Sequence, residues 1–358
     1  MKRVVVTGPG QITVEEVEPP GASGPGEVSL QLHTVGICGG DIALLAGRNP
    51  LVSYPVVPGH ECVATVADDR HPSFAEGSAV VVYPTFACGD RRACRACRED
   101  RPNHCPRMTV LGLSRPAGCL VERFVLPANQ CIPIPTELGA RVGALLEPLA
   151  VAAHVTARSG VRPGDSVLVL GSGAIGIATG LTARALGAER VLFADIRPGR
   201  SAVLARLGFA DFSTRTDAEL VEWVRDTAGG VDVVYDTVTI SSTAAVASRV
   251  LERGGRYCAV AAAKAGQRLE LDYQSFYQRE LSLIGCRNYT PADFEAAIAR
   301  VHSGQIDPVA LRTGVFGLTA AEHAFAELTG RPEDNVKVLL TRDELLGSTP
   351  LLSSGAGR

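Results

Sequence analysis

Short apolar runs separated by glycine and proline follow one another along the first part of the chain, from Met1 to about Pro135. The runs VVVT, EVSLQLHTV, CVATV and SAVVVYP are rich in valine, a residue that favours strands. Glycine and proline mark the turns between them. The pattern predicts a compact all-β fold without a long helix.

The pattern changes at Thr136. Residues 136–159 (TELGARVGALLEPLAVAAHVTARS) are rich in alanine and leucine and predict a helix. From Asp165 to about Ile284, strands alternate with helical stretches, which is typical of a βαβ domain with a parallel sheet. The last part predicts helices in PADFEAAIARVHSG and AAEHAFAELTG and a strand in NVKVLLT, and we expect it to pack back on the first domain. The tail GSTPLLSSGAGR has little to bury and is expected to be disordered.

Length and charge narrow the class of protein. With 358 residues the chain exceeds the size at which one hydrophobic core keeps growing, so two domains are expected. The formal net charge is −3 without an extended tract of one sign, so nucleic acid is not favoured as a partner and a small molecule fits better. The N-terminal residues turn polar too soon for a signal peptide, and no run of roughly twenty apolar residues occurs. We expect a soluble cytoplasmic protein without a membrane partner.

A glycine-rich turn opens the central domain. Residues 165–176 read DSVLVLGSGAIG, a hydrophobic strand that runs into G-x-G-x-x-G and then into the helix IATGLTARALGA. The first glycine permits a tight turn, the second lets the backbone approach a pyrophosphate, and the third lets helix and strand pack closely. The helix N-terminus faces the phosphate charge. The motif predicts a dinucleotide site formed by Gly171, Gly173, Ala174, Ile175 and Gly176.

An acidic residue stands at the end of the next predicted strand. The segment RVLFADI ends with Asp195 and Ile196, and the Asp195 carboxylate lies about twenty residues after the glycines. A carboxylate there accepts hydrogen bonds from the adenosine ribose and repels a 2′-phosphate, so NAD is preferred over NADP. Arg197 and Arg200 follow, and Arg200 is a further cofactor-binding candidate. Arginines here can stack on adenine, rescue NADP binding or remain solvated, and a glycine turn in an unrelated α/β fold is the alternative for the whole motif.

Four of the ten cysteines crowd one short stretch with the spacing C-x5-C-x2-C-x7-C. Four thiolates at tetrahedral geometry make a closed zinc site without room for substrate, so its role would be structural. The loop is rich in arginine and lacks apolar residues, so metal would supply its folding energy. Free surface cysteines and a nucleic-acid-binding zinc knuckle are the alternatives; acidic residues and the lack of an aromatic residue argue against the knuckle. The predicted ligands are Cys88, Cys94, Cys97 and Cys105.

Two further motifs, GICGGD around Cys38 and PGHE around His60 and Glu61, lie in the β-rich part. Cysteine, histidine and carboxylate are the mixed ligand set of a catalytic zinc with an open coordination position. Sequence separation alone leaves this open, because a histidine near a buried cysteine is more often a core residue.

The motifs occur together in one order. Gly36-Ile-Cys38, Gly59-His60-Glu61, the cysteine loop, LEPLAVAAHV with Glu147, and GSGAIG resemble the medium-chain zinc alcohol dehydrogenase family. Within it they look most like the polyol (sorbitol), threonine and sugar-acid (galactonate, gulonate) dehydrogenases, in which a glutamate replaces the third ligand cysteine of liver-type enzymes.

The resemblance implies an α/β protein: a GroES-like β domain with an inserted Rossmann domain, a doubly wound parallel sheet. The expected bounds are 1–146 for the GroES-like zinc and substrate domain, 147–287 for the Rossmann NAD-binding domain, 288–345 for the C-terminal return and 346–358 for the tail. Family members are commonly homodimers or homotetramers, so we expect a homo-oligomer.

The same resemblance assigns residues to two zinc ions per chain, one catalytic and one structural. Cys38 and His60 become catalytic zinc ligands, and Glu61 and Glu147 supply carboxylates directly or through water. A helix-cap or surface carboxylate is the alternative for Glu147. His154, further along the same predicted helix, is interpreted as a core residue.

The sequence departs from the family at the proton relay. The residue two after the ligand cysteine is usually Ser or Thr, with a histidine shortly after, but here they are Gly40 and Ala43, which carry no proton donor. Glu61 or a chain of waters could carry the proton instead, or the substrate could need no relay. The five residues between the first two loop cysteines, where relatives have two, put only Cys88 in doubt.

The sequence therefore predicts a zinc-dependent oxidoreductase that transfers a hydride between NAD(H) and a secondary alcohol or ketone of a polyhydroxylated compound (a polyol, a sugar acid or an amino alcohol). One alternative is an NADH-dependent reductase of a C=N or C=C bond. The other is a non-catalytic scaffold that binds NAD and zinc, for which the intact set of metal-ligating residues would be unexpected.

Overall fold

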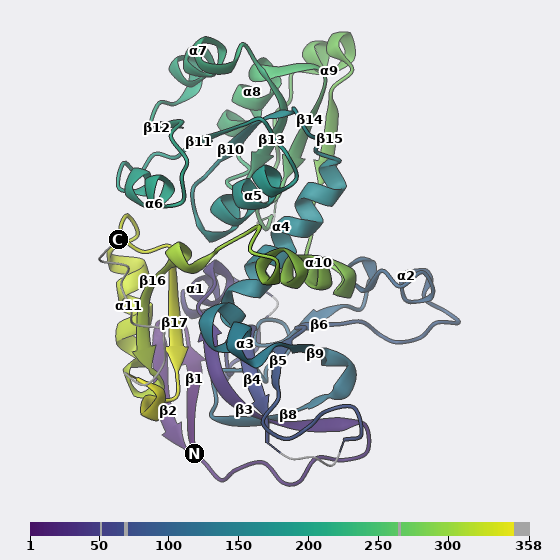
Figure 1. Ribbon diagram of the computed structural model, residues 1–358, viewed down its shortest axis with the longest axis vertical. Helices are drawn as coiled ribbons and strands as arrows, with labels where there is room; N and C mark the ends of the chain where they lie inside the picture. Colours follow the sequence, from purple (N-terminus) through teal and green to yellow (C-terminus); the bar gives the residue numbers. More distant parts are fainter. Residues whose placement is uncertain (51, 68–70, 264–265, 347–358) are drawn as a thin grey trace. The chain divides into compact units, whose positions relative to one another are not determined.

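The computed structural model describes residues 1–50, 52–67, 71–263 and 266–346, and the chain divides into two compact units. The first comprises Met1–Glu147 and Arg312–Arg358, and the second comprises Pro148–Leu311. Figure 1 colours the chain along its sequence and shows the late strands β16 and β17 among the early ones. The second unit is thus an insertion in the chain of the first.

The first unit is built on a mainly antiparallel sheet in the order β16-β17-β3-β4-β5-β9, with β8 also paired to β3. Side chains of β3 alternate between half-buried and buried positions, as expected for a strand with one face on the core. The strands of the sheet are β3 (Glu27–Gly36), β4 (Glu61–Val66), β5 (Ala79–Val82), β8 (Arg123–Pro127), β9 (Cys131–Ile134), β16 (Arg312–Gly317) and β17 (Lys337–Thr341).

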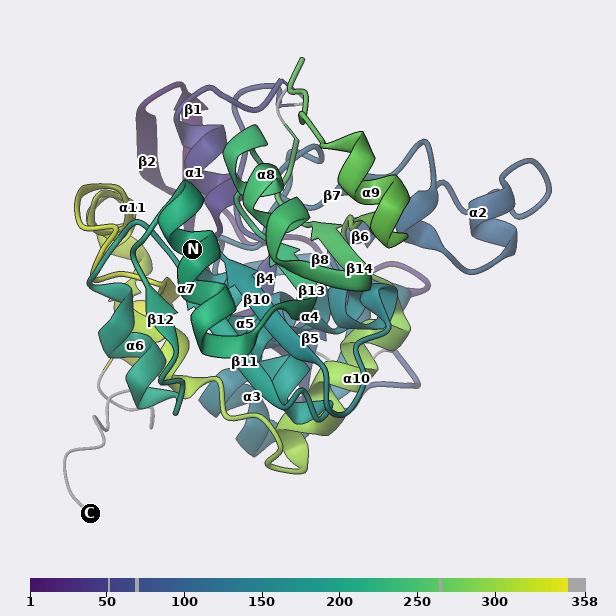
Figure 2. The same cartoon turned by 90° about the horizontal axis from the view of Figure 1, so that it is seen from above.

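Smaller elements complete the first unit. A hairpin joins β1 (Lys2–Gly8) to β2 (Gln11–Glu16), and β6 (Thr85–Phe86) pairs with β7 (Thr109–Val110) at the base of the cysteine loop. In Figures 1 and 2 this loop, which carries α2, extends away from the strands of its unit. The helices are α1 (Gly39–Leu45), α2 (Arg95–Arg98), α3 (Thr136–Val142) and α11 (Ala321–Gly330), and α4 (Leu146–Ser159) begins at the end of the unit.

The second unit holds a six-stranded parallel sheet in the order β12-β11-β10-β13-β14-β15. Its central strands are mostly apolar and almost completely buried, which is typical of a parallel sheet covered by helices. The strands are β10 (Ser166–Leu170), β11 (Arg190–Ala194), β12 (Phe212–Ser213), β13 (Val231–Asp236), β14 (Leu251–Ala259) and β15 (Ser282–Gly285). The helices are α5 (Ala174–Ala185), α6 (Arg200–Arg206), α7 (Asp217–Ala228), α8 (Ser241–Val250), α9 (Tyr273–Arg279) and α10 (Pro291–His302), together with most of α4.

The second unit ends later than the sequence predicts. Helix α10 belongs to it, so the boundary lies after Leu311 and not after residue 287. The reason is local packing that the pattern did not reveal: Asp293 of α10 bonds His154 of α4, and the rings of Tyr289 and Phe294 meet edge to face. The tail beyond Leu346 lies outside the described residues. Among the described helices, none is both long and apolar enough to cross a membrane.

Candidate metal and cofactor sites

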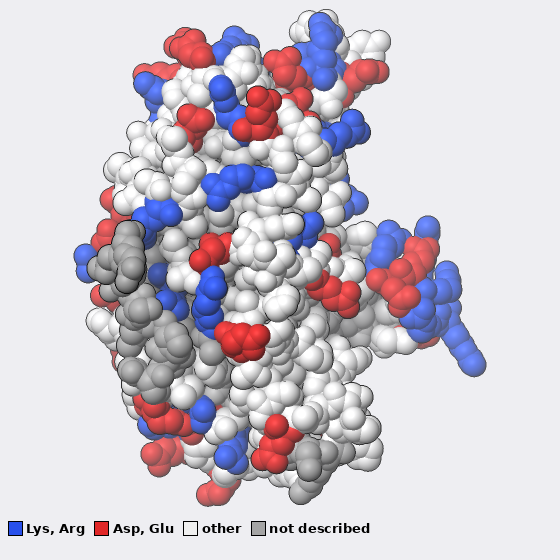
Figure 3. Space-filling view, viewed as in Figure 1, with Lys and Arg blue, Asp and Glu red and all other residues white. Residues whose placement is uncertain are grey.

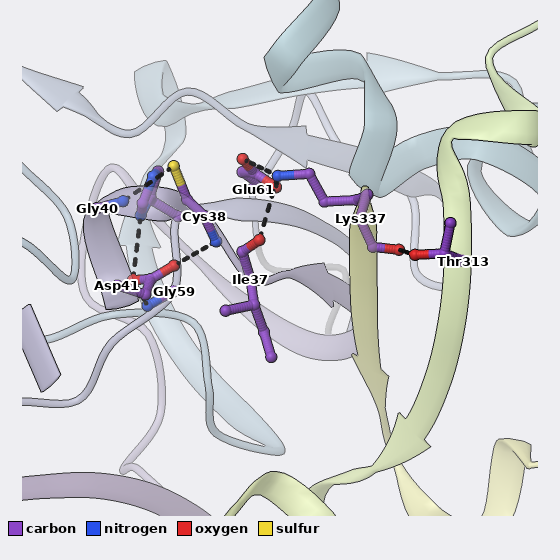
Figure 4. Close-up of polar contacts among 9 residues, drawn as sticks. Ile37, Cys38, Gly40, Asp41, Gly59, Glu61, Thr313 and Lys337 are labelled. Atoms are coloured by element: carbon purple, nitrogen blue, oxygen red, sulfur yellow. Dashed lines mark hydrogen bonds and ion pairs between the residues drawn. The ribbon is translucent and has the colours of Figure 1, made fainter. Parts of the chain in front are cut away.

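Cys38 lies where β3 has ended and α1 begins. It is the N-cap of α1: its Sγ accepts a hydrogen bond from Gly40 N at 3.4 Å, and Asp41 Oδ2 accepts one from Cys38 N at 2.9 Å. These reciprocal bonds form a capping box that satisfies backbone donors at the helix end. Figure 4 shows the resulting position of the thiol beside Glu61. The cap fixes the direction in which Cys38 points.

His60 reaches the same place from the turn before β4. Gly59 has φ of +96°, a conformation that favours glycine, and its N donates to Asp41 Oδ1 at 3.2 Å. The same Oδ1 lies 3.6 Å from His60 Nδ1. Burial alone would lower the pKa of His60, but the nearby Asp41, foremost through its charge, and Cys38 outweigh burial and raise that pKa well above its usual value. Asp41, which the sequence analysis did not identify, thus positions both Cys38 and His60.

Cys38, His60 and Glu61 come together as the sequence predicts. One potential ligand atom of each lies within 4.8 Å of the other two, and His60 and Glu61 are buried while Cys38 is half-buried. Thiolate, imidazole and carboxylate suit zinc, and three protein ligands would leave a fourth position open. The arrangement therefore fits a catalytic zinc ion.

Glu61 is held by a lysine that sequence reasoning missed. Lys337, the first residue of β17, places Nζ 2.6 Å from both Oε1 and Oε2 of Glu61 and 3.2 Å from Ile37 O. Figure 4 shows this ion pair, and both side chains are almost completely buried. Burial lowers the pKa of Lys337, but the negative charges, Glu61 foremost, outweigh it and raise the pKa. The only sequence signal was a lysine inside the apolar run NVKVLL.

The strand register explains how these two residues meet. Gly36 of β3 pairs with Glu61 on one side and with Leu339 of β17 on the other. A Cβ at Gly36 would collide with the Glu61 carboxylate, so only glycine leaves room for it there. The glycine of the G-I-C motif therefore has a packing role beside its place in the motif.

Glu147 lies in the first turn of α4 and is buried. It is outside the group of residues whose ligand atoms lie within 4.8 Å of one another. Its charge is one of those that raise the pKa of Lys337, after those of Glu61 and Cys38, so it faces the same cluster. Its role as a metal ligand remains a prediction.

Leucine fills the space at the relay position. A Cβ at Gly40 would lie 3.3 Å from both methyl groups of Leu113, tighter than ordinary van der Waals contact. Leu113 packs in a small apolar cluster with Val6, Leu44 and Val56. The surroundings of Gly40 are thus apolar where family members usually carry a hydroxyl.

All four cysteines of the loop gather at one point. The sulfurs of Cys88, Cys94, Cys97 and Cys105 lie within 4.8 Å of one another, so the long first spacing does not displace Cys88. The extra residues are taken up by a turn in which Asp90 Oδ1 accepts hydrogen bonds from the backbone N of Arg92 and of Ala93. Four converging sulfurs fit a tetrahedral structural zinc site.

The thiols of this group differ in acidity. A backbone hydrogen bond at Asp90 and neighbouring thiols lower the pKa of Cys88 to about 7, and Arg107 Nη2 donates to its Sγ at 3.1 Å. Burial, with hydrogen bonds from the other thiols, raises the pKa of Cys97 to about 12. Arginines of the loop pair with acidic residues of the same loop: Arg91 with Asp100, and Arg95 and Arg101 with Glu99. Figure 3 shows these charges side by side on the projecting loop.

The glycine-rich turn of the second unit joins β10 to α5. Gly171 has φ of +92°, and a Cβ at Gly176 would collide with Gly171 O, so both positions require glycine. Helix α5 begins at Ala174 with Gly173 as its N-cap, and Ile175 and Gly176 lie in its first turn. Strand, turn and helix N-terminus thus follow one another as a dinucleotide site needs.

A pocket of about 410 Å³ opens beside this turn. Gly171, Gly173 and Asp195 line it, and Asp195 accepts hydrogen bonds from Ser172 N at 2.7 Å and Arg197 N at 3.0 Å. Arg200 is buried at the start of α6 and is not among the lining residues. The lining also includes Ile196, Arg197, Arg215, Thr216, Thr237, Val238, Ile240 and Thr243.

Comparison with known proteins identifies the family of the chain. Residues 24–136 match the alcohol dehydrogenase GroES-like domain, and residues 174–303 match the zinc-binding dehydrogenase domain. L-idonate 5-dehydrogenase of Vitis vinifera is 31% identical over 88% of this chain and 88% of its own. Sorbitol dehydrogenase of Arabidopsis thaliana is also 31% identical, over 88% of each chain.

Solved structures share the fold over most of the chain. An alcohol dehydrogenase from Escherichia coli CFT073 complexed with NADH superposes with a TM-score of 0.87, at 26% identity over 95% of this chain and 99% of the other. A zinc-binding dehydrogenase from Sinorhizobium meliloti 1021 bound to NADP gives 0.85, at 27% identity over 95% and 98%.

The fold and the cysteine, histidine and carboxylate cluster thus define a zinc-binding dehydrogenase of the medium-chain type, with a GroES-like and a Rossmann domain. The chain belongs to the zinc-containing alcohol dehydrogenase family, in the branch of polyol and sugar-acid dehydrogenases, whose members are oxidoreductases.

Proposed function

We propose that the protein transfers a hydride between NAD(H) and a secondary alcohol or ketone of a polyhydroxylated compound, with zinc at Cys38, His60 and Glu61. The observation that carries the proposal is the buried cluster of these three side chains, which suits zinc with one open position. The names of the relatives, an idonate and a sorbitol dehydrogenase, support the substrate class.

Each residue of the cluster has a separate task. Cys38 and His60 would hold the zinc, and Glu61 or Glu147 would add a carboxylate directly or through water. Zinc bound there would supply a Lewis acid that lowers the pKa of a substrate hydroxyl. One oxygen of the Asp41 carboxylate faces the His60 ring, and the other accepts a hydrogen bond from the backbone N of Cys38, so Asp41 orients both residues. Lys337 neutralises Glu61, which allows a carboxylate to stay buried at the site.

We propose NAD as the preferred cofactor. The carboxylate of Asp195 lines the pocket beside the glycine-rich turn, where it would accept hydrogen bonds from the ribose and repel a 2′-phosphate. Arg197 and Arg215 line the same pocket, and their positive charges would attract a 2′-phosphate. The preference for NAD over NADP therefore depends on Asp195.

The apolar surroundings of Gly40 favour a second candidate function. Leu113 occupies the neighbourhood where a relay hydroxyl would project, and Ala43 adds no proton carrier. A reductase of C=N or C=C bonds needs no such relay at this position. Under the main proposal the proton would leave through water or through Glu61.

The four loop cysteines are proposed to hold a structural zinc ion. Their sulfurs already converge within 4.8 Å, and beside them the loop has only a small buried cluster, built mostly of the cysteines themselves, and ion pairs at its exposed surface. Such surface pairs contribute little stability. Zinc would therefore supply most of the free energy that orders this loop.

We also propose that the protein is a homo-oligomer that associates through the edge of the second sheet. Strand β15 is an edge strand, and its Leu283 is 47% exposed. Tyr273 and Tyr277 of α9, which packs near β14, are 78% and 74% exposed. A bare edge strand with apolar neighbours is a ready template for pairing with a second copy. A monomeric mass of the wild type in solution would contradict this; Leu283→Lys should shift an oligomer towards monomer.

The dehydrogenase proposal is tested by following NADH with zinc-loaded protein. Polyols, aldonates and amino alcohols are compared with their keto, imine and conjugated counterparts. Cys38→Ala should abolish zinc-dependent turnover of a hydroxyl compound, whereas Cys119→Ala, a buried cysteine of the same unit, should retain it. Response to imine or conjugated substrates alone would favour the reductase. NADH binding without any turnover would favour the scaffold.

A further inference from the structure

One residue beside the cofactor pocket has a strained backbone conformation. Thr239 lies between the end of β13 and the start of α8 and has φ of +52°. Left-handed backbone is an outlier for a β-branched residue, because its Cβ crowds the neighbouring carbonyl oxygen. Within the described ranges, Thr239 is the only β-branched residue with this conformation. Strained residues persist only where the surrounding structure holds them, and they cluster at ligand-binding sites.

The carboxylate of Asp236, the last residue of β13, holds this turn. Its Oδ1 accepts hydrogen bonds from Val238 N at 2.9 Å and from Thr239 N at 2.7 Å. Its Oδ2 accepts one at 2.8 Å from the hydroxyl of Tyr257 on the neighbouring strand β14, and both side chains are completely buried. Burial and the charge of Asp236 raise the pKa of the Tyr257 phenol, so the phenol stays protonated and donates. Asp236 thus ties the turn to the sheet.

The side chain and the carbonyl of Thr239 add further hydrogen bonds. Thr239 Oγ1 donates to Asp236 O at 2.8 Å and accepts a hydrogen bond from Ala261 N at 3.2 Å. Gln267 Nε2 donates to Thr239 O. The backbone N, the hydroxyl and the carbonyl of Thr239 therefore all have partners, which offset the cost of the left-handed conformation.

The same turn is joined to the glycine-rich turn. Thr237 Oγ1 donates to Leu170 O at 2.9 Å and to Gly171 O at 3.2 Å. A Cβ at Gly171 would lie 2.5 Å from Thr237 Oγ1, so the two turns pack directly against each other. Thr237 and Gly171 both line the pocket of about 410 Å³. The two turns therefore form adjoining parts of the pocket wall.

The strained turn presents two apolar side chains to the pocket. Val238 and Ile240, on either side of Thr239, line the pocket and are 42% and 44% exposed. Apolar side chains that line a pocket are typical of a ligand-binding surface. The left-handed residue between them sets the direction in which the chain leaves β13 and enters α8. Thr239 therefore determines where both side chains lie.

We propose that Asp236 and Thr239 are positioning residues for the cofactor: a buried carboxylate holds a strained turn, and the turn places Val238 and Ile240 against the dinucleotide. Neither Asp236 nor Thr239 is among the residues that line the pocket, so each acts through its neighbours. A wall that is fixed before binding saves the free energy of ordering it when the ligand arrives. The inference rests on the proposed function, because it requires a nicotinamide dinucleotide in this pocket.

The test measures the Kd of NADH for the full zinc-loaded protein, without substrate, from the change in NADH fluorescence on binding. Asp236→Ala removes the acceptor of two backbone N–H groups and should raise the Kd about 10-fold or more. Asp236→Asn keeps an acceptor oxygen and should remain within about 3-fold of the wild type. A Kd for Asp236→Ala equal to that of the wild type overturns the role of Asp236.

Substitutions of Thr239 test the strain and do not depend on the folding of Asp236→Ala. Thr239→Val keeps the branched Cβ but lacks the hydroxyl, so the strained turn loses two hydrogen bonds and the Kd of NADH should rise about 10-fold. Thr239→Gly lacks the same hydroxyl but adopts left-handed backbone without strain, so it should bind NADH more tightly than Thr239→Val. The opposite order, or equal binding by the two variants, overturns the role of the strain.

A mutant cycle tests whether the turn acts through its two apolar side chains. In a chain that carries Val238→Ala and Ile240→Ala, Thr239→Val should weaken NADH binding far less than it does in the wild type. Equal effects in both chains overturn the positioning role, because a general loss of structure would weaken binding in both. Failure of the wild type to bind NADH refutes the proposed function and this inference together. Wild-type affinity in Asp236→Ala and Thr239→Val refutes this inference alone.

Discussion

Replacing Lys337 by methionine should destabilise the protein far more than most single substitutions. The thioether carries no charge and no proton donor, so the substitution leaves the Glu61 carboxylate without the Nζ that now lies 2.6 Å from both of its oxygens. Glu61 has no exposed surface through which water could replace that partner. Removing one partner of a buried pair leaves an uncompensated charge and typically costs about 3–5 kcal/mol. This would be a large part of the stability of an ordinary domain.

A double-mutant cycle isolates the effect of the charge. Glu61→Gln with Lys337→Met removes both charges, so the double variant should lose less stability than Lys337→Met alone. Urea unfolding of zinc-loaded protein, followed by a probe of the first unit, gives the free energies. A loss below about 1 kcal/mol for Lys337→Met, or two additive single effects, would refute the reasoning, because surface pairs behave in that way.

The remaining predictions concern pH, the cofactor, the loop and the relay. Because the pKa of Lys337 is raised on folding, the contribution of Lys337 to the free energy of unfolding should be constant below about pH 10.5 and be lost only as pH rises through the still higher pKa of the folded state. Alkaline unfolding of the wild type and of the double variant tests this prediction. Asp195→Asn should weaken NADH binding about 10- to 100-fold and raise the kcat/KM ratio of NADP to NAD, by loss of a charged acceptor; an unchanged ratio would assign the preference elsewhere. Cys94→Ser should lower the zinc content by about one ion per chain and expose the loop to proteolysis, and full zinc content would argue against the structural site. Gly40→Ser should cost about 1–3 kcal/mol through overpacking on Leu113, and Leu113→Ala in the same chain should relieve much of it; a Gly40→Ser variant as stable as the wild type would show that Leu113 moves away freely.

Local motifs were predicted well from the sequence because their chemistry is contained in adjacent residues. The turn at Gly171 and Gly176 is fixed by backbone geometry within a few positions, and strand, turn and helix all follow as expected. The sequence also predicted that Cys38 and His60 lie together, although only the resemblance to a family supported that prediction. The structure supplies the physical reason, which is Asp41 between them.

Residues that act through distant pairing escaped sequence reasoning. Lys337 meets Glu61 across 276 residues, and nothing near either residue signals the other. The end of the second unit was placed too early for a similar reason, since the contact between His154 and Asp293 spans 139 residues. Hydrophobic periodicity identifies a helix such as α10 but does not say which core it joins.

The pairing of β17 with β3 also sets an order of events during synthesis. Strand β3 and Glu61 are synthesised early, but Lys337, the first residue of the strand β17 that pairs with β3 and the only described cation that bonds Glu61, follows Glu61 by 276 residues. At about 5–20 residues per second, roughly 15 to 55 seconds pass before Lys337 has been made. During this interval the entire second unit is translated and can fold around its own sheet. The first unit meanwhile has an unpaired edge at β3 and a Glu61 carboxylate without its lysine partner. A nascent chain halted before β17 is therefore expected to be a natural client of chaperones that cover exposed strand edges.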